Sequence, residues 1–405
     1  MSTSSPSDFT ELLNSVNWNL LSHAYGPARD APDHLMALLN GDQNEKAGAV
    51  NYLYGAIAHQ GSLFLATAPV ALAVASILLD PRLAPPVDHW TDFVDGRGTL
   101  RSHLLNFLAT VVEGCRFDTP RSELQAKAHP IGRDADVVAV ALSFASGTLE
   151  PDGWSDEVIA EAYDARSVLA CRDACPRLAD PVFRCLDDPS WQVRVHAGHC
   201  ATRLIRHPEL ADRQTGLASR LEQMAIRGTG RERAAMVLSL GELGAAPRRF
   251  LTDPEPAVRA CAALAPALAT EPGATREILT ALADPVQADA WLPLIPQLDG
   301  RLRFLLVKEA IARVASFEEL VAAAIAVANV TSHYAVERDW GPLLAAAFPV
   351  PVGRPPDFTP AQRSFLAALV TNEALWDRRF GNPRPWFQKV GLPYDRDGCR
   401  RLLDS

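Results

Sequence analysis

The chain has few lysines, few aromatic residues and no cysteine framework. Only four of its 39 basic residues are lysines, and aromatic residues make up 7% of its 405 residues. Its seven cysteines are scattered and odd in number, which indicates a reducing compartment rather than a disulfide-stabilised secreted domain. The Ser-rich start has no basic patch followed by an apolar core, so no signal peptide is predicted. These features favour a cytoplasmic protein.

Positive charge is also in deficit. The net charge is −9 and the pI is about 5.6. Affinity for duplex nucleic acid comes largely from cations set against phosphates, so an acidic chain is a poor default nucleic-acid binder.

The mostly apolar stretch 63–79 is at the lower length limit for a membrane span and contains Pro69. We expect a buried helix that begins near Pro69 instead of a membrane contact.

Several motifs that indicate an enzyme are missing from the sequence. There is no Gly-x-Ser-x-Gly elbow and no His-Glu-x-x-His helix. Gly228-Thr229-Gly230 lacks the third glycine and the preceding strand of a phosphate-binding loop. The sequence therefore predicts no catalytic residue, no cofactor and no metal site.

What the chain does have is helical periodicity. Ala and Leu dominate, and the apolar fraction of 48% is enough for a continuous core. Few stretches alternate with the period of two that strands show. Apolar residues instead recur at helical spacing, as in Ala47, Val50, Leu53, Tyr54 and Ile57. The predicted fold class is all-α.

One phrase occurs twice. Asp-Pro-x-x-x-Val-Arg-x-x-Ala begins at Asp188 and again at Asp253, and a weaker version follows Glu232 between them. A helix start, a Val-Arg pair and a small residue return in the same order. Such repetition predicts stacked helical hairpins in which each unit covers its neighbour's apolar face.

The pattern predicts helices along most of the chain. In the N-terminal part they are expected at about 9–21, 31–39, 44–59, 69–79, 100–115 and 135–146. In the central part they are expected at about 156–171, 177–186, 190–205, 214–227, 230–244, 254–269, 274–283, 287–298 and 301–314, with a truncated helix near 248–251. The C-terminal part should hold helices at 317–330 and 360–376. The predicted divisions are 1–150, 151–315 and a cap at 316–405, all in one continuous solenoid.

The repeated phrase resembles the HEAT-repeat family over about residues 156–315. The resemblance implies an α-solenoid, a HEAT-like or armadillo-like superhelix. It implies that Val193 and Val258 face the core. It also implies an inter-repeat ladder in which arginines at the turns bond aspartates, formed here by Arg194, Arg259, Asp188 and Asp253. The segments 18–26 and 57–61 are similar to actinobacterial HEAT-repeat proteins, a group that brings no established reaction.

The densest polar group lies near the N-terminus. It comprises His23, Tyr25, Asp30, His34 and His59. Adjacent helices of a hairpin lie about 8–10 Å apart, so two or three of these side chains can converge. Such a group can bind a metal or perform acid–base chemistry, or it can consist of packing and turn-capping side chains. From this region the candidate binding residues are His23, Tyr25, His59 and Gln60.

A local basic patch gives a second candidate site. It comprises Arg227, Arg231, Arg233, Arg248 and Arg249, and Trp191 is considered with it. The patch can contact an acidic protein or a phosphate backbone, or it can be a solvated face with ion pairs inside the repeats. The candidate binding residues here are Trp191, Arg227, Arg231 and Arg233.

Two further clusters are expected to be structural. The first holds Cys171, Cys175, Cys185, His196, His199 and Cys200, but no Cys-x-x-Cys knuckle that zinc usually requires. Its cysteines should be small buried hydrophobes. The second is an aromatic cluster in the C-terminal tail, which should cap the last repeat or, alternatively, form a binding surface: Trp376, Phe380, Trp386, Phe387 and Tyr394.

The leading hypothesis is a non-catalytic protein-binding scaffold or adaptor that uses the concave face of a solenoid. An acidic groove would capture a basic partner in a salt-dependent way. One alternative is a nucleic-acid-binding protein similar to HEAT-like DNA glycosylases. A second is a small-ligand lyase or chaperone, which rests on fold analogy alone. A capped solenoid closes its own core, so the chain should be a monomer.

Overall fold

The computed structural model is all-α and describes residues 6–87, 98–149, 155–293, 295–298, 300–353, 357–377 and 379–404. The chain forms two compact units, Met1–Arg220 and Leu221–Ser405, called unit 1 and unit 2 below. The boundary between them lies inside the helix Gln214–Arg227. This division differs from the one expected from the sequence, which placed boundaries near residues 150 and 315.

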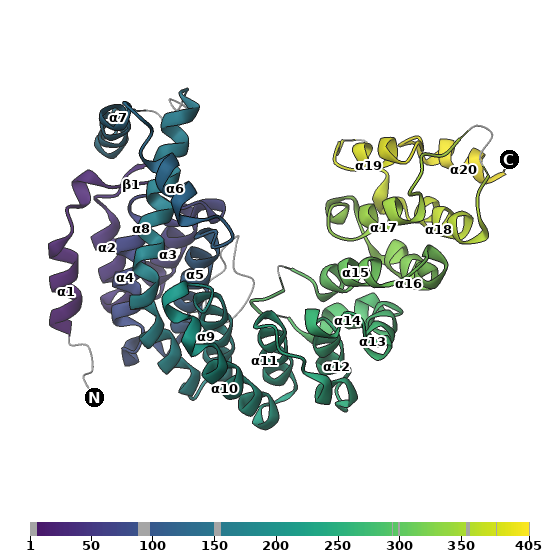
Figure 1. The fold of residues 1–405 in the computed structure, drawn as a ribbon, viewed down its shortest axis with the longest axis horizontal. Coiled ribbons are helices and arrows are strands. Elements are labelled where there is room, and N and C mark those ends of the chain that lie inside the picture. Colours follow the sequence, from purple (N-terminus) through teal and green to yellow (C-terminus); the bar gives the residue numbers. More distant parts are fainter. Residues whose placement is uncertain are drawn as a thin grey trace. The chain divides into compact units, whose positions relative to one another are not determined.

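Unit 1 contains the first ten helices (Figure 1). Their bounds are α1 Pro6–Ser15, α2 Ala31–Asn40, α3 Gln43–Tyr52, α4 Thr67–Ile77, α5 Leu100–Gly114, α6 Arg121–Ala128, α7 Asp134–Ser146, α8 Glu157–Arg184, α9 Trp191–Leu204 and α10 Gln214–Arg227, the last of which continues into unit 2. Two antiparallel strand pairs accompany them: β1 Ser22–His23 with β2 Gly26–Pro27, and β3 Pro86–Val87 with β4 Gly98–Thr99.

Helix α8 organises unit 1. It packs against α4, α5, α6, α7 and α9. The sequence predicted two helices here, 156–171 and 177–186. Pro176 and Pro181 both lie within α8, although proline lacks the N–H that an interior helix position needs. That prediction is wrong, since α8 is continuous over 28 residues. Cys171, Cys175 and Leu178 lie on one buried face across the proline, and burial of that face keeps the helix intact.

Unit 2 contains the remaining helices. Their bounds are α11 Gly230–Glu242, α12 Pro256–Ala263, α13 Pro272–Leu282, α14 Pro285–Trp291, α15 Leu302–Arg313, α16 Phe317–Val330, α17 Trp340–Ala347, α18 Pro360–Thr371, α19 Arg384–Lys389 and α20 Arg396–Asp404. They pack in two neighbouring rows, visible in Figure 1: α12, α13, α16, α18 and α20 form one row, and α15, α17 and α19 form the other.

Most predicted helices are confirmed within a few residues. The expected truncated helix near 248–251 is a 3₁₀ turn, Arg248–Thr252. Five helices are shorter than predicted by three residues or more: α1, α3, α12, α14 and α18. The segment 118–133, expected to be loop-like or briefly helical, contains the short helix α6. In the described part of the chain, no helix is long and apolar enough to cross a membrane, and 63–79 holds the buried helix α4.

The core positions of the repeated phrase are confirmed. Val193 and Val258 are both buried, as are Ala197 and Ala262. The small alanines let neighbouring helices approach closely, so each copy of the phrase places one valine and one alanine at a helix–helix contact.

Arginines cap neighbouring helices. Arg101 at the start of α5 donates from Nε to the Leu78 carbonyl at 2.8 Å and from Nη2 to the Asp80 carbonyl at 2.8 Å, and its guanidinium pairs with the Asp188 carboxylate. The last carbonyls of a helix have no intrahelical partner, so a buried guanidinium satisfies groups that would otherwise be orphaned. Arg101 therefore joins the end of α4 to the turn before α9.

Arg233 repeats this arrangement in unit 2. Its Nε donates to the Ala225 carbonyl at 3.0 Å and its Nη2 to the Gly228 carbonyl at 3.3 Å, at the end of α10. Its Nη1 pairs with Asp253 Oδ2 at 3.1 Å. The carboxylate of each repeated Asp-Pro turn is thus bonded by an arginine from an earlier helix.

The repeated Asp-Pro turns use other side-chain partners than the family resemblance implies: Arg101 and Arg233 pair with the Asp188 and Asp253 carboxylates, and Arg259 pairs with Glu277 of α13 at 2.9 Å. Arg194 donates to the backbone carbonyl of Asp188 at 2.7 Å, and Arg259 donates to that of Asp253 at 3.0 Å. Each arginine is the fourth residue of its helix, so its guanidinium reaches back over its own first turn and meets the turn's carbonyls. The carboxylates of the two turns are bonded by arginines of earlier helices instead.

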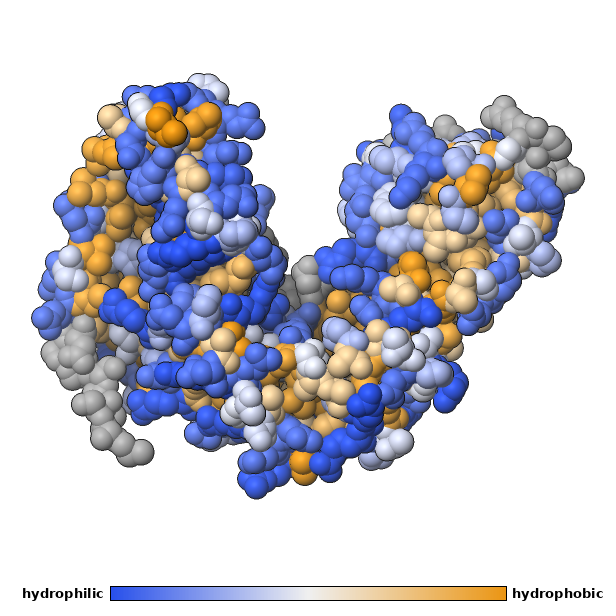
Figure 2. Space-filling view, viewed as in Figure 1, coloured by the Kyte–Doolittle hydropathy of each residue, from blue (hydrophilic) through white to orange (hydrophobic). Residues whose placement is uncertain are grey.

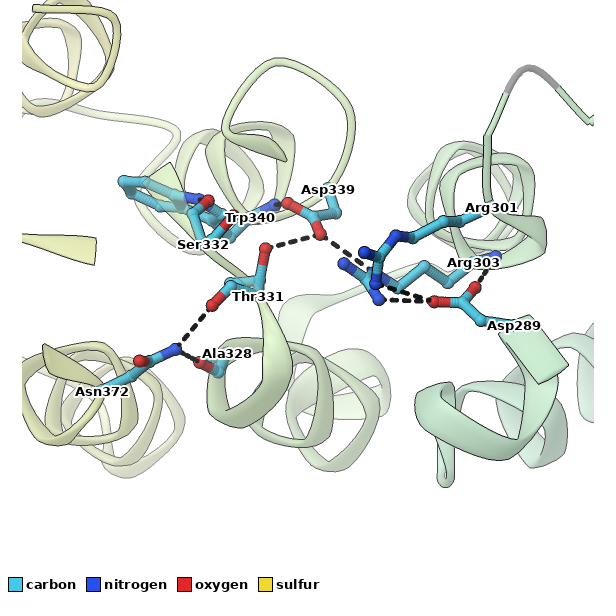
Figure 3. A network of polar contacts seen from close by, with 9 residues as sticks. All are labelled: Asp289, Arg301, Arg303, Ala328, Thr331, Ser332, Asp339, Trp340 and Asn372. Atoms are coloured by element: carbon cyan, nitrogen blue, oxygen red, sulfur yellow. Dashed lines mark hydrogen bonds and ion pairs between the residues drawn. The ribbon is translucent and has the colours of Figure 1, made fainter. Parts of the chain in front are cut away.

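Unit 2 also encloses an ion network (Figure 3). Asp339 is fully buried and accepts hydrogen bonds from Thr331 Oγ1 at 2.7 Å and from Arg303 Nε at 3.1 Å. Arg303 also pairs with Asp289, which lies 3.6 Å from Arg301. The network links α14, α15 and the start of α17, and its polar groups satisfy one another inside the unit.

Candidate functional site

The N-terminal polar group converges in unit 1. Six side chains meet there, called the imidazole–phenol cluster below: His23, Tyr25, Asp30, His34, Tyr52 and His59. Five of them are aromatic rings in continuous contact. The sequence predicted that two or three of these residues could meet, and the structure brings together all five that it named.

A tight hairpin presents Tyr25. Strands β1 and β2 pair His23 with Gly26, so Ala24 and Tyr25 form a two-residue turn. Gly26 has φ of +124°, a conformation that residues with a Cβ rarely adopt. The Tyr25 ring is 62% exposed at this turn. The hairpin thus holds a large aromatic side chain out into solvent.

Three contacts fix the hairpin to the helices. The Ala24 N–H donates to the Ala56 carbonyl at 3.1 Å, and the Ala66 N–H donates to the Ser22 carbonyl at 3.2 Å. The Ser22 and Tyr163 hydroxyls are hydrogen-bonded at 2.6 Å. Because these bonds reach α8, the segment after α3 and the residue before α4, the hairpin is fixed to the helices of unit 1.

The rings form a row. His34 stacks on Tyr52 with centroids 4.0 Å apart, and Tyr52 meets the edge of His23 at 5.4 Å. His23 contacts Tyr25 at 6.4 Å, and Tyr25 contacts His59 at 5.3 Å. Aromatic pairs at these separations add to stability beyond simple area burial. Tyr25 is the exposed ring of this row, since His34, Tyr52 and His59 are half-buried and His23 is buried.

Asp30 supplies the only carboxylate among the six side chains. Its Oδ1 accepts the Tyr52 hydroxyl at 2.8 Å and lies 3.5 Å from His23 Nε2. The Asp30 side chain is 47% exposed. A half-exposed carboxylate bonded to the Tyr52 hydroxyl presents negative charge in the same cluster as aromatic rings, and both attract a cationic group.

His23 is almost fully buried. The Tyr25 N–H donates to His23 Nδ1 at 3.1 Å, so the proton of the neutral ring is on Nε2. His23 Nε2 is buried and has no hydrogen-bond partner in the described structure. Burial lowers the pKa of His23, and the nearby Asp30 opposes that shift. Because no substrate atom can reach Nε2, the arrangement favours binding over acid–base catalysis at this ring.

The backbone next to the cluster is irregular. After α3, residues Leu53–Ile57 form a π-helical turn, and the Ala58 N–H bonds the Leu53 carbonyl. Gln60, a predicted binding residue, is exposed and has φ of +51°. Single π turns and left-handed non-glycine residues often mark functional sites. His59 Nδ1 contacts the Gly55 carbonyl at 2.9 Å, which orients its ring towards Tyr25.

The cluster lies in the acidic half of the chain. Unit 1 has 27 acidic and 18 basic residues, a net charge of −9, whereas unit 2 has 21 of each. The whole net charge of the chain is therefore in unit 1. Nine of the ten histidines are there too.

The basic patch is not a free cationic surface. Arg233 is occupied with carbonyls and Asp253, Arg248 pairs with Glu271, and Arg249 lies 3.8 Å from Glu222. Arg227 and Arg231 are exposed in unit 2. Trp191, which the sequence considered with this patch, is half-buried at the start of α9 in unit 1. The ion pairs count against a phosphate-backbone contact at Arg233, Arg248 and Arg249.

The Cys and His cluster is interior. All seven cysteines are buried free thiols, and Cys115 Sγ lies 3.8 Å from Cys175 Sγ. His199 Nδ1 accepts a hydrogen bond from Arg203 at 2.8 Å. Burial lowers the pKa of His196 to about 3. Among the described residues, no group of three or more His, Cys, Asp or Glu side chains is placed to hold a metal ion.

The C-terminal aromatic residues pack on one another. Phe387 is buried and contacts Trp340, Trp376 and Tyr394 at centroid distances of 5.9, 5.3 and 5.4 Å. Phe380 instead stacks on His333 at 4.2 Å, away from this core. Phe387 therefore fills the interior of the last helices, whereas the other four aromatic residues are half-buried: Trp376, Phe380, Trp386 and Tyr394.

Sequence analysis missed Tyr52. Its neighbours Leu53 and Tyr54 belong to the apolar stripe of the helix, whereas Tyr52 lies off that stripe. A large aromatic residue on the polar side of a helix is the signal that could have found it.

No protein-family model, curated protein or solved structure matches this chain.

Proposed function

We propose that the protein is a non-catalytic protein-binding scaffold of the helical-repeat type, and that the imidazole–phenol cluster is where unit 1 contacts a basic partner. The observation that carries the proposal is the exposed Tyr25 ring, fixed by a bonded hairpin beside the Asp30 carboxylate. Tyrosine is enriched in the residues that dominate protein–protein affinity, because it supplies contact area at a small entropic cost.

Two further observations support a helical-repeat scaffold. The Asp-Pro-x-x-x-Val-Arg phrase places equivalent valines in the core of unit 1 and of unit 2. Helices of unit 2 pack in successive neighbouring rows. These are features of HEAT-like solenoids, which use their surfaces for recognition and need no catalytic group.

Charge supports a basic partner. Unit 1 carries a net charge of −9, and the cluster adds the half-exposed Asp30. A surface whose charges are mainly of one sign raises the association rate of an oppositely charged partner and makes binding sensitive to salt. A partner rich in Lys and Arg is therefore the class that this surface fits.

The experiment is affinity capture from the native host lysate with three full-length baits: the wild type, Tyr25→Ala and Tyr334→Ala. Tyr334 is a matched control, since it is 72% exposed but lies in unit 2. Mass spectrometry should identify a basic protein that the wild type and Tyr334→Ala retain and that Tyr25→Ala loses. Equal recovery by all three baits would show that the cluster is not the contact.

A further inference from the structure

Helix α7 of unit 1 is apolar on more than one side. From Val137 to Leu149 no residue is charged. One side of the helix is buried: Val137 packs with Ile159 of α8, and the Phe144 ring contacts Tyr163 at 6.3 Å. A helix that is hydrophobic all round is normally buried all round. The other side of α7 is nevertheless exposed, which makes it a candidate contact surface.

The exposed side of α7 carries an apolar stripe. Ala135, Val138, Ala139 and Leu142 are all exposed and follow the spacing i, i+3, i+4 and i+7 of a single helix face. Val138 and Leu142 are 47% and 44% exposed. Figure 2 shows hydrophobic side chains at the surface of the end of unit 1 that holds α7. Contiguous exposed apolar surface of this kind marks interaction sites.

The stripe is complementary to itself in size. Two copies of α7 can pack antiparallel about a two-fold axis that passes between residues 138 and 139. Val138 of each copy then faces Ala139 of the other, and Leu142 faces Ala135. Each large side chain meets a small one, which is the arrangement that lets two helix surfaces interdigitate. A two-fold axis uses the same face of both copies, so no second surface is needed.

Charge favours a second copy on this face over a basic segment of another protein. The acidic residues of α7 are Asp134 and Asp136, both in its first turn, and they pair with Arg166 and Arg133. Within α7 a basic segment would therefore find no unpaired carboxylate. In the antiparallel arrangement the two first turns lie at opposite ends of the contact, so the acidic residues of the two copies do not face each other.

We propose that the exposed face of α7 binds α7 of a second copy of this chain in an antiparallel, reversible dimer. A helix of 13 residues is about 20 Å long, so one face of it is smaller than the roughly 800 Å² per partner that a standard stable interface buries. The dimer should therefore dissociate on dilution. The sequence led to a monomer because a capped solenoid closes its own core, but the outer face of α7 is apolar surface that the core does not cover.

Sedimentation velocity of the full-length protein over a range of concentrations tests the proposal at low and at high salt. The mass should rise from that of one chain, 43.9 kDa, towards that of two as the concentration rises. Each copy brings a unit 1 with a net charge of −9, so salt should strengthen the dimer by screening the repulsion. Binding of a basic partner should weaken with salt instead, which separates this proposal from the proposed function.

Two matched variants locate the contact. Val138→Glu brings two carboxylates together at the axis and should weaken dimerisation about ten-fold or more. Val286→Glu changes a valine that is 60% exposed in α14 of unit 2, and it should leave dimerisation unchanged. A chain that stays monomeric at every concentration and salt, or a Val138→Glu protein that dimerises as the wild type does, would overturn the proposal.

Cysteine cross-linking tests the antiparallel orientation. All seven native cysteines are buried, so a cysteine on the exposed stripe should react first. With oxidised glutathione as the oxidant, a mixture of the Ala135→Cys and Leu142→Cys proteins should form a disulfide between chains. Leu142→Cys alone should not, because the two copies of that residue lie seven residues, or about 10 Å, apart along the helix pair. Faster cross-linking of Leu142→Cys alone than of the mixture would contradict the antiparallel dimer.

Discussion

Single residues explain the bias towards arginine. Arg172, buried in α8, donates from Nε to the Cys115 carbonyl at 2.7 Å and from Nη2 to the Thr119 carbonyl at 3.0 Å, so it closes the end of α5. A planar guanidinium has five donors in a fixed fork, and a lysine ammonium cannot reproduce that geometry. Arginines such as Arg101, Arg172 and Arg233 therefore have a structural reason.

The buried network around Asp339 gives a residue-scale prediction. Asp339→Ala removes a fully buried carboxylate and leaves Arg303 and Thr331 short of an acceptor, which should cost about 3–5 kcal/mol in the free energy of unfolding. Urea denaturation measures this. Asp397→Ala, whose carboxylate is 69% exposed and pairs with Arg400, should change stability by about 0.5 kcal/mol or less. A comparable loss in both variants would contradict a special role for the network.

Buried histidines should make stability depend on pH. Burial lowers the pKa of His196 to about 3, and it also lowers the pKa values of His103 and His199. Below about pH 6.5 these histidines bind protons in the unfolded chain but stay neutral in the folded state. The free energy of unfolding should therefore fall as the pH drops from 6.5 towards 3, with a slope of up to about 1.4 kcal/mol per pH unit for each histidine.

Urea unfolding at pH 7.5 and at pH 5.5 tests this dependence. His196→Gln should reduce the slope between the two pH values by the share of one histidine, up to about 1.4 kcal/mol per pH unit. His129→Gln, which replaces a side chain that is 62% exposed, should leave the slope unchanged. A slope that His196→Gln does not reduce would show that this ring does not contribute to it.

The sequence predicted which residues belong to the candidate site better than it predicted their contacts. The sequence named His23, Tyr25, Asp30, His34 and His59 as a group because they are polar and close along the chain. Whether such side chains touch depends on a hairpin and a π turn that no simple periodicity describes. For the arginine patch the sequence left two interpretations open, since it shows the charges but not the carboxylates that pair with them.

At the scale of elements, periodicity predicted helices well and their ends less well. The predicted ranges 214–227 and 317–330 match α10 and α16. The prediction of two helices is wrong at α8, which continues through Pro176, because tertiary burial outweighs one lost backbone hydrogen bond. The two-residue strands β1 and β2 were not predicted, since pairs this short leave no alternation to detect.

The hairpin gives a prediction at this scale. Gly26→Ala puts a Cβ on a residue with φ of +124°, although no atom would clash with it, so the cost is backbone strain of about 1–3 kcal/mol. Gly48→Ala, in an open position of α3, should instead stabilise the protein by about 0.5–1 kcal/mol.

Thermal unfolding of the two glycine variants measures both effects. If the hairpin presents Tyr25 to a partner, Gly26→Ala should also reduce capture of that partner while Gly48→Ala does not. A Gly26→Ala protein with wild-type stability would show that the strained conformation is not needed.

At the scale of the whole molecule, the two units differ in charge more than in architecture. Both are helical, and each contains one copy of the repeated phrase, in α9 and in α12. Unit 1 alone carries the net negative charge and nine of the ten histidines. The overall charge of −9 was evident from the sequence, but its confinement to one unit was not, because the sequence placed the boundaries elsewhere.

The central claim is that unit 1 is an acidic docking surface for a basic protein, with Tyr25 at its contact. The most direct measurement is the dissociation constant between the purified full-length protein and its captured partner at low and at moderate salt, for the wild type and for Tyr25→Ala. The account predicts affinity that weakens about ten-fold or more as salt rises, and a loss of about 2 kcal/mol or more in Tyr25→Ala. Affinity insensitive to both salt and Tyr25 would contradict it.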